Sequence, residues 1–137
     1  MYAKLDDNLL TGNKSIDKQH AELIERINQL IKCCEENGGQ REAIKMLDYL
    51  ADYTEYHFTE EEELQKKADY PGYAKHKEKH DNFRNTVKEL HAMLEEEQGP
   101  TPAFVAAVNK NVIDWLYGHI QGFDCSVATY IHMNDFL

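Results

Sequence analysis

The chain has 137 residues, 42% of them hydrophobic, and its formal net charge is −10 at pH 7. This length suits one domain with its own core, and the negative charge argues against a nucleic acid or a membrane surface as partner, because both would repel the chain. No apolar run approaches the roughly 18–20 residues of a membrane span and no signal peptide is evident, so we expect a cytoplasmic protein.

Pairs of glycine and proline residues divide the chain into four long segments with the pattern of amphipathic helices. The pairs are Gly38-Gly39, Pro71-Gly72 and Gly99-Pro100. Between them, apolar residues recur every three or four positions, which is typical of helices that bury one face. We predict an N-terminal arm, four bundle helices and a tail that can form a short extra helix, over residues 1–14, 15–37, 41–67, 73–97, 102–124 and 125–137.

The ends of these segments carry start and stop signals. Gly38 is a natural residue to stop the first helix, and Thr101 followed by Pro102 is a good start for the fourth. Because the connections between the segments are short, the sequence predicts an all-α fold. We expect one domain over residues 1–137, built as an up-down-up-down antiparallel four-helix bundle.

Each predicted helix places at least one histidine on its apolar stripe. The set is His20 on the first helix, His57 with Glu61 on the second, His76 with His80 on the third and His119 on the fourth. Residues four apart lie on the same face of a helix, so each pair can reach one ligand. His91 lies one position off its stripe and His132 lies in the tail, and we interpret both as surface or boundary residues.

Taken singly, these residues have ordinary explanations. A lone inward histidine is more often a hydrogen-bonded core residue than a ligand, and the acidic run 60–63 is normally a solvated helix face. Helical phase, however, puts only Glu61 in register with His57 and points the other three acids elsewhere. Five imidazoles and a carboxylate in one core would leave unpaired polar groups at a few kcal/mol each, a cost that a bound metal removes.

Asp124, five positions after His119, brings the set to seven potential ligands. Seven are too many for one metal and suit two metals that share carboxylate bridges. The mixture of imidazole and carboxylate favours a first-row transition metal, with iron, zinc and manganese all open. The ferritin-like di-iron proteins use a Glu-x-x-His repeat instead, and this sequence contains none.

The ligand pattern resembles the hemerythrin family, in particular its prokaryotic bacteriohemerythrin branch. The resemblance rests on His20 followed in order by "HFTEE", "HKEKH" and "HIQGFD", and on the flanking segments "IDKQHAELIERINQL", "YPGYAKHKEKHDNF" and "WLYGHI", and it covers about residues 9–125. It implies two non-heme iron ions with an oxo or hydroxo bridge. One iron would take His76, His80 and His119, the other His20 and His57 with a position left open, and Glu61 and Asp124 would bridge them.

The resemblance also implies reversible binding of dioxygen, for storage, delivery or sensing, rather than enzymatic turnover. The residues expected to line an apolar oxygen pocket are Leu116, Ile24, Phe58, Ile120 and Trp115. Two alternatives stay open: a di-iron redox enzyme that handles peroxide or nitric oxide, and a regulatory module that responds to the state of the iron. Dioxygen is the expected partner, and an unknown redox or delivery partner remains open.

Two features outside the ligand set, the N-terminal arm and Cys125, need expectations of their own. We expect Leu5, Leu9 and Leu10 to dock the arm, although the arm lacks the tryptophan that is frequent in the family. Cys125 is either a small buried residue or a thiol that oxidises when peroxide escapes; the three cysteines form no CxxC pair and fit a reducing compartment.

The five-residue spacing of His119 and Asp124 rotates the second side chain by about 140° beyond a full helical turn. For Asp124 to return to the bundle axis, we predict that the fourth helix loosens or ends near Gly122, through a wide turn or a fraying last turn. In this prediction the glycine permits the distortion.

Overall fold

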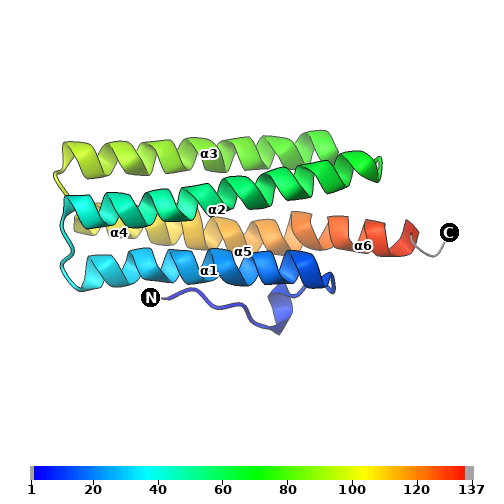
Figure 1. Ribbon diagram of the computed structural model, residues 1–137, viewed down its shortest axis with the longest axis horizontal. Coiled ribbons are helices and arrows are strands. Elements are labelled where there is room, and N and C mark those ends of the chain that lie inside the picture. Colours follow the sequence, from blue (N-terminus) through cyan, green and yellow to red (C-terminus); the bar gives the residue numbers. More distant parts are fainter. Residues whose placement is uncertain (1, 135–137) are drawn as a thin grey trace.

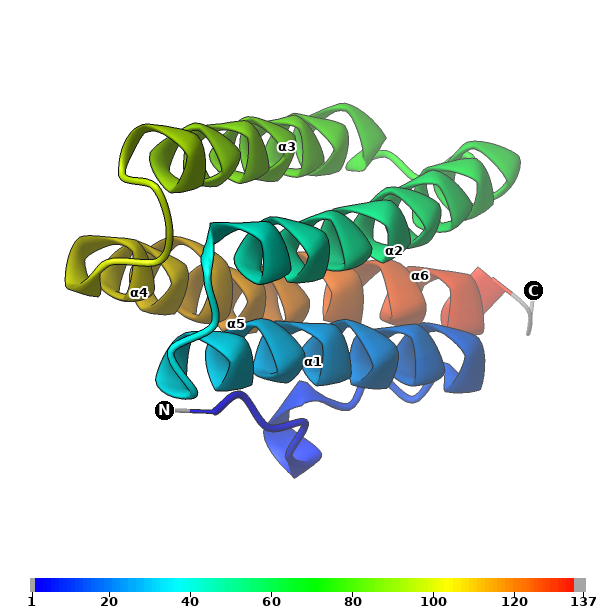
Figure 2. The same ribbon diagram turned by 60° about the vertical axis from the view of Figure 1, so that its left-hand side comes forward.

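Four roughly parallel helical rods form the molecule, as Figures 1 and 2 show for the computed structural model, which describes residues 2–134. The first three rods are α1 (Lys14–Glu35), α2 (Gln40–Lys67) and α3 (Tyr73–Glu96). The fourth is continuous but not uniform, and consists of α4 (Pro102–Val108), η2 (Asn109–Asp114), α5 (Trp115–His119), η3 (Ile120–Asp124) and α6 (Cys125–Asn134). The predicted all-α four-helix bundle is confirmed.

The first three rods end in the same way. At the C-terminal end of each rod, a residue with positive φ is followed by a residue whose backbone N–H donates to the carbonyl five positions earlier. This arrangement is a Schellman motif. The positive-φ residues are Asn37, Asp69 and Gln98, at φ 58, 52 and 60°. The prediction that Gly38 itself stops the first helix was therefore wrong by one position, because Asn37 takes the left-handed conformation.

The starts of α1 and α4 are capped by side chains. Asn13 accepts a hydrogen bond from the backbone N–H of Ile16 at 3.0 Å, which explains why α1 begins slightly before the predicted residue 15. Thr101 accepts from the N–H of Phe104 at 3.2 Å, with Pro102 as the first helical residue, so the predicted start of the fourth helix is confirmed.

The N-terminal arm docks on α1, and Figure 1 shows it running alongside and below that helix. Asn28 of α1 holds Ala3 through two hydrogen bonds, accepting from its N–H at 2.8 Å and donating to its carbonyl at 3.0 Å. Ala3 and Leu9 are buried, whereas Leu10 is 47% exposed, so its expected docking role was wrong. The short helix η1 (Asp7–Leu9) turns Leu9 inward, and this leaves Leu10 outside.

The fourth rod contains two π-helical stretches, η2 and η3, in which each turn holds one residue more than an α-turn. The predicted wide turn between His119 and Asp124 is confirmed by η3, although the helix does not end there. The role predicted for Gly122 was wrong. Its φ is not positive, and a Cβ built on it meets no atom within 4 Å, so the wide turn does not need a glycine.

Candidate metal centre

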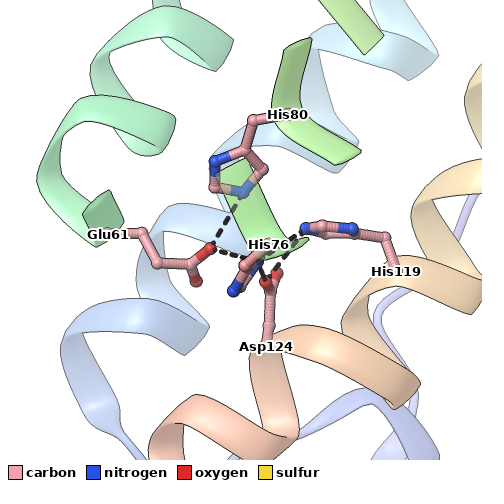
Figure 3. A group of neighbouring side chains, drawn as sticks. All are labelled: Glu61, His76, His80, His119 and Asp124. Carbon is pink, nitrogen blue, oxygen red and sulfur yellow. Dashed lines mark hydrogen bonds and ion pairs between the residues drawn. The ribbon is translucent and has the colours of Figure 1, made fainter. Parts of the chain in front are cut away.

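Seven side chains from all four rods meet in one buried cluster, near the end of the bundle where α2 leads into α3. They are His20, His57, Glu61, His76, His80, His119 and Asp124, and none is more than 4% exposed. Figure 3 shows five of them, with imidazoles from α3 and the fourth rod turned toward the carboxylates of Glu61 and Asp124. The structure thus brings together every residue predicted as a ligand, while His91 and His132 lie outside the cluster.

The ligand atoms of the cluster fall into two groups, and within each group they all lie within 4.8 Å of one another. The larger group contains Glu61, His76, His80, His119 and Asp124, and the smaller contains His20, His57, Glu61 and Asp124. Both carboxylates belong to both groups. This is the arrangement needed by two neighbouring cations that share two bridging carboxylates.

The spacing of the ligand atoms fits metal coordination. Nε2 of His76 lies 2.9 Å from Nε2 of His119 and 3.0 Å from Oε1 of Glu61. Two ligands held at right angles by bonds of roughly 2.1 Å are separated by about 3.0 Å. Among the described residues, the two oxygens of Glu61 and Nε2 of His80 are buried without a hydrogen bond, which is costly unless a cation binds them.

Asp124 is the electrostatic centre of the cluster. Its Oδ2 lies 2.7 Å from Nε2 of His20, and its Oδ1 lies 2.9 Å from Nε2 of His76. Burial alone would raise the pKa of Asp124, but hydrogen bonds from the surrounding imidazoles hold that pKa well below its usual range. Asp124 therefore stays ionised at neutral pH, and its negative charge is available to a cation.

The imidazoles respond differently to the same surroundings. Burial opposes the charged form of His76, but its contacts with Asp124 and Glu61 outweigh burial and raise the pKa of His76 to about 9. Burial lowers the pKa of His119, and its contact with Asp124 offsets this only in part. Without metal, a proton on His76 therefore balances part of the carboxylate charge at pH 7, and an incoming cation must displace it.

A second layer of polar side chains holds three of the imidazoles by their outer nitrogens. Nδ1 of His57 donates to Oε1 of Gln19 at 2.6 Å, and Nδ1 of His80 donates to Oε2 of Glu62 at 2.8 Å. Nδ1 of His76 lies 2.9 Å from Nε2 of Gln65, from which it can only accept. For His57 and His80, the hydrogen bond from Nδ1–H leaves the Nε2 lone pair free for a metal, so this layer fixes the ligand tautomer of those two residues.

This layer was not predicted from the sequence, because helical phase alone placed Glu62 away from the axis. The structure corrects that placement, because Glu62 is only 8% exposed and turns toward His80 on α3. A signal for Gln65 existed: it lies four residues after Glu61 and continues the stripe of His57 and Glu61. No comparable signal marks Glu62, because it lies off the stripe of His57 and Glu61.

Aromatic rings cover the imidazoles. Phe58 stacks on His80 with ring centroids 3.9 Å apart, and the half-buried Trp115 stacks on His119 at 4.4 Å. The three aliphatic residues predicted for the oxygen pocket are buried in the core of the bundle: Ile24, Leu116 and Ile120. The whole predicted set thus lies in contact with the cluster or in the core, and its role in lining a pocket stays a prediction.

Cys125 is half-buried, with its Sγ 4.0 Å from the carbonyl oxygen of Leu10. Burial raises the pKa of its thiol, and the negative charges of Asp124 and Asp17 add to the effect. The thiolate is the form that reacts, so these surroundings favour the interpretation of Cys125 as a packing residue.

Within residues 2–134, no helix is both long and apolar enough to cross a membrane.

The family model described as hemerythrin HHE cation binding domain matches residues 11–124. Bacteriohemerythrin from Stenotrophomonas maltophilia is 33% identical over 133 residues, which cover 95% of this chain and 83% of that protein. Bacteriohemerythrins from Aquifex aeolicus and Methylococcus capsulatus are 31% and 35% identical, over 85% and 79% of this chain and 88% and 79% of theirs. With this similarity over most of its length and a buried cluster of histidines and carboxylates, the chain belongs to the hemerythrin family of cation-binding domains.

Proposed function

We propose that the chain binds dioxygen reversibly at a centre of two iron ions, and that it does so as a carrier, store or sensor rather than as an enzyme. The observation that carries the proposal is the unequal division of the cluster. One group of ligands has three imidazoles and the other has two, while both share Glu61 and Asp124. A cation in the smaller group has fewer protein ligands, which leaves room for a small exogenous molecule.

In this proposal His76, His80 and His119 hold one iron, His20 and His57 hold the other, and the two carboxylates bridge them. Two iron ions would supply the electrons for a reversible reduction of dioxygen. Neutral imidazoles make up most of the ligand set, so the total charge of the centre stays low. The family model, described as a cation-binding domain, supports a metal at this site, and iron is the metal that the resemblance to bacteriohemerythrins implies.

The protein's own contribution is to exclude water and to hold the ligands in place. The stacked rings of Phe58 and Trp115 shield the larger group, and Leu116 and Ile120 are at most 4% exposed beside the same helix turn. A dry apolar surrounding limits the loss of protons and of reduced oxygen species to solvent, which favours reversibility over turnover. The three free cysteines suit a reducing compartment such as the cytoplasm.

The test is a spectrum of the Fe(II)-loaded protein before air, in air and after removal of oxygen, with Zn(II)-loaded protein as control. We expect a colourless ferrous protein, an absorption band in air, and recovery when oxygen is removed. Immediate irreversible oxidation with release of peroxide, together with turnover on added reductant, would instead establish the redox-enzyme alternative. Absence of any iron-dependent band would overturn the proposal.

One contact favours the regulatory alternative. The backbone N–H of Lys4 in the arm donates to the hydroxyl of Tyr117 at 2.8 Å, and Tyr117 lies two residues before His119. A shift of α5 on a change of iron state would therefore reach the arm. Limited proteolysis of the arm in oxidised and reduced protein tests this, and identical cleavage would remove the alternative.

A further inference from the structure

The outer partners of the imidazoles differ in charge. His57 and His76 contact the neutral amides of Gln19 and Gln65, whereas His80 donates to the carboxylate of Glu62. Among the described residues, Nδ1 of His20 and Nδ1 of His119 have no hydrogen-bond partner. The larger group of ligands therefore contains the one imidazole that is backed by a negative charge.

The carboxylate of Glu62 is itself held by a cation. Its Oε2, the atom that accepts from His80, also lies 3.1 Å from a terminal nitrogen of Arg84. Arg84 donates in addition to Glu55 and to Asp81, both at the surface, through contacts of 2.8 and 2.7 Å. Arg84 and His80 thus donate to the same oxygen, and the guanidinium reduces the negative charge that Glu62 presents to the imidazole.

The same arginine also contacts the other side of the His80 environment. Its guanidinium carbon lies 5.2 Å from the centre of the Phe58 ring, and Phe58 stacks on His80. His80 is therefore fixed in two ways, by its ring face against Phe58 and by its Nδ1 against Glu62, and Arg84 supports both. Figure 3 shows the consequence for the inner edge of the ring, where the other nitrogen of His80 is directed at Glu61.

We propose that Glu62 is a positioning residue that fixes the Nδ1–H tautomer of His80 and makes the metal ion in the three-histidine group the more electron-rich of the two, while Arg84 limits this effect. The proposal rests on the proposed function in that it assumes a metal centre. A carboxylate acceptor draws the Nδ1 proton toward itself and increases electron donation from Nε2. It follows that the two metal ions differ in potential even before their ligand numbers are considered.

Two variants should shift the midpoint potential of the iron centre in opposite directions. Glu62→Gln keeps an acceptor of the same shape but removes the charge, so the midpoint potential of the iron centre should rise and metal affinity should fall by roughly 10-fold or more. Arg84→Met keeps an apolar stem but removes the cation, so the potential should fall. The matched control is Glu55→Gln, which removes a surface partner of Arg84 and should leave the potential nearly unchanged.

The measurements are an equilibrium redox titration of the Fe(II)-loaded protein and an anaerobic titration of the metal-free protein with Fe(II). Potentials that move in the same direction for Glu62→Gln and Arg84→Met, or that equal the wild-type value, would overturn the proposal. If either variant fails to fold by circular dichroism, the other variant still tests the sign of the shift against the Glu55→Gln control.

A readout on the metal-free chain separates this proposal from the proposed function. Nitrogen-15 NMR of the histidine side chains should show His80 as the Nδ1–H tautomer in wild type and in Glu62→Gln, and a mixture of tautomers in Glu62→Leu. That result would stand even if the chain proved to bind a metal other than iron. A His80 that is Nε2–H in the wild-type protein would disprove the positioning role.

Discussion

The two halves of the bundle differ in the polarity of their interiors. In the half that contains the α1–α2 and α3–α4 connections, the interior is apolar and includes Leu30, Leu47, Leu94 and Phe104, all fully buried. In the other half, the interior is the cluster of imidazoles and carboxylates, in which several buried polar atoms of the described residues make no hydrogen bond. Burial of apolar surface stabilises the first half without any ligand. The polar half needs bound cations to compensate its buried carboxylates and imidazoles.

The largest effect on stability should come from the apolar half. Phe104→Ala removes a ring that is 0% exposed and should lower the free energy of unfolding by about 3–5 kcal/mol. Metal stoichiometry of the folded fraction should stay unchanged, because Phe104 lies away from the cluster. Urea unfolding of metal-free protein and metal analysis of the folded protein check the two parts. A loss of metal at full folding would show that the halves are not separate.

The next effect concerns the division within the polar half. His57→Ala removes a ligand from the smaller group only, and His76→Ala removes one from the larger group only. Each should lower metal affinity by on the order of 100-fold at its own site, since even an outer partner is worth 10–100-fold. Binding isotherms of Fe(II) with both variants measure this. Because the proposed reaction takes electrons from both irons, both variants should lose the oxygen-dependent spectrum while one metal still binds tightly at the intact group, and loss of both metals in either variant would contradict the division into two groups.

The third effect is a pH dependence of metal binding. Below a pH of about 9, His76 of the metal-free chain carries a proton that the cation must displace. Because protonation competes with the metal, affinity should rise with pH and level off above about 9. Titration calorimetry in buffers of different ionisation enthalpy counts the released protons. Proton release that does not decline between pH 7 and pH 10 would contradict the assignment of that proton to His76.

The smallest effect is expected at Gly122. Glycine costs about 0.5–1 kcal/mol relative to alanine inside a helix, and a Cβ at this position meets no neighbour within 4 Å. Gly122→Ala should therefore stabilise the protein slightly and leave metal content unchanged. Thermal unfolding with metal analysis checks this. A loss of metal would restore the earlier prediction that the wide turn depends on the glycine.

The parts of the site that follow helical periodicity could be predicted from the sequence, and the parts that depend on contacts between helices could not. His57 with Glu61 and His76 with His80 follow a spacing of four, and the short connections allowed one topology. The contact of Glu62 with His80 depends on how α2 and α3 are rotated against each other. The apolar pattern of one helix does not predict this rotation. The stop at Asn37 was missed because asparagine adopts positive φ less obviously than the glycine after it.

The two wide turns of the fourth rod have a consequence for how such a site arises. A π-helical turn is equivalent to one residue inserted into an α-helix, and η3 places this extra residue between His119 and Asp124. In a regular α-helix the spacing of five would turn the carboxylate about 100° further from His119 than a spacing of four, and the wide turn of η3 absorbs this extra rotation. On this rod the width of the turn matters as much as the number of residues. A chain can therefore gain one codon between two ligands and keep both of them in the cluster, provided that the helix widens there.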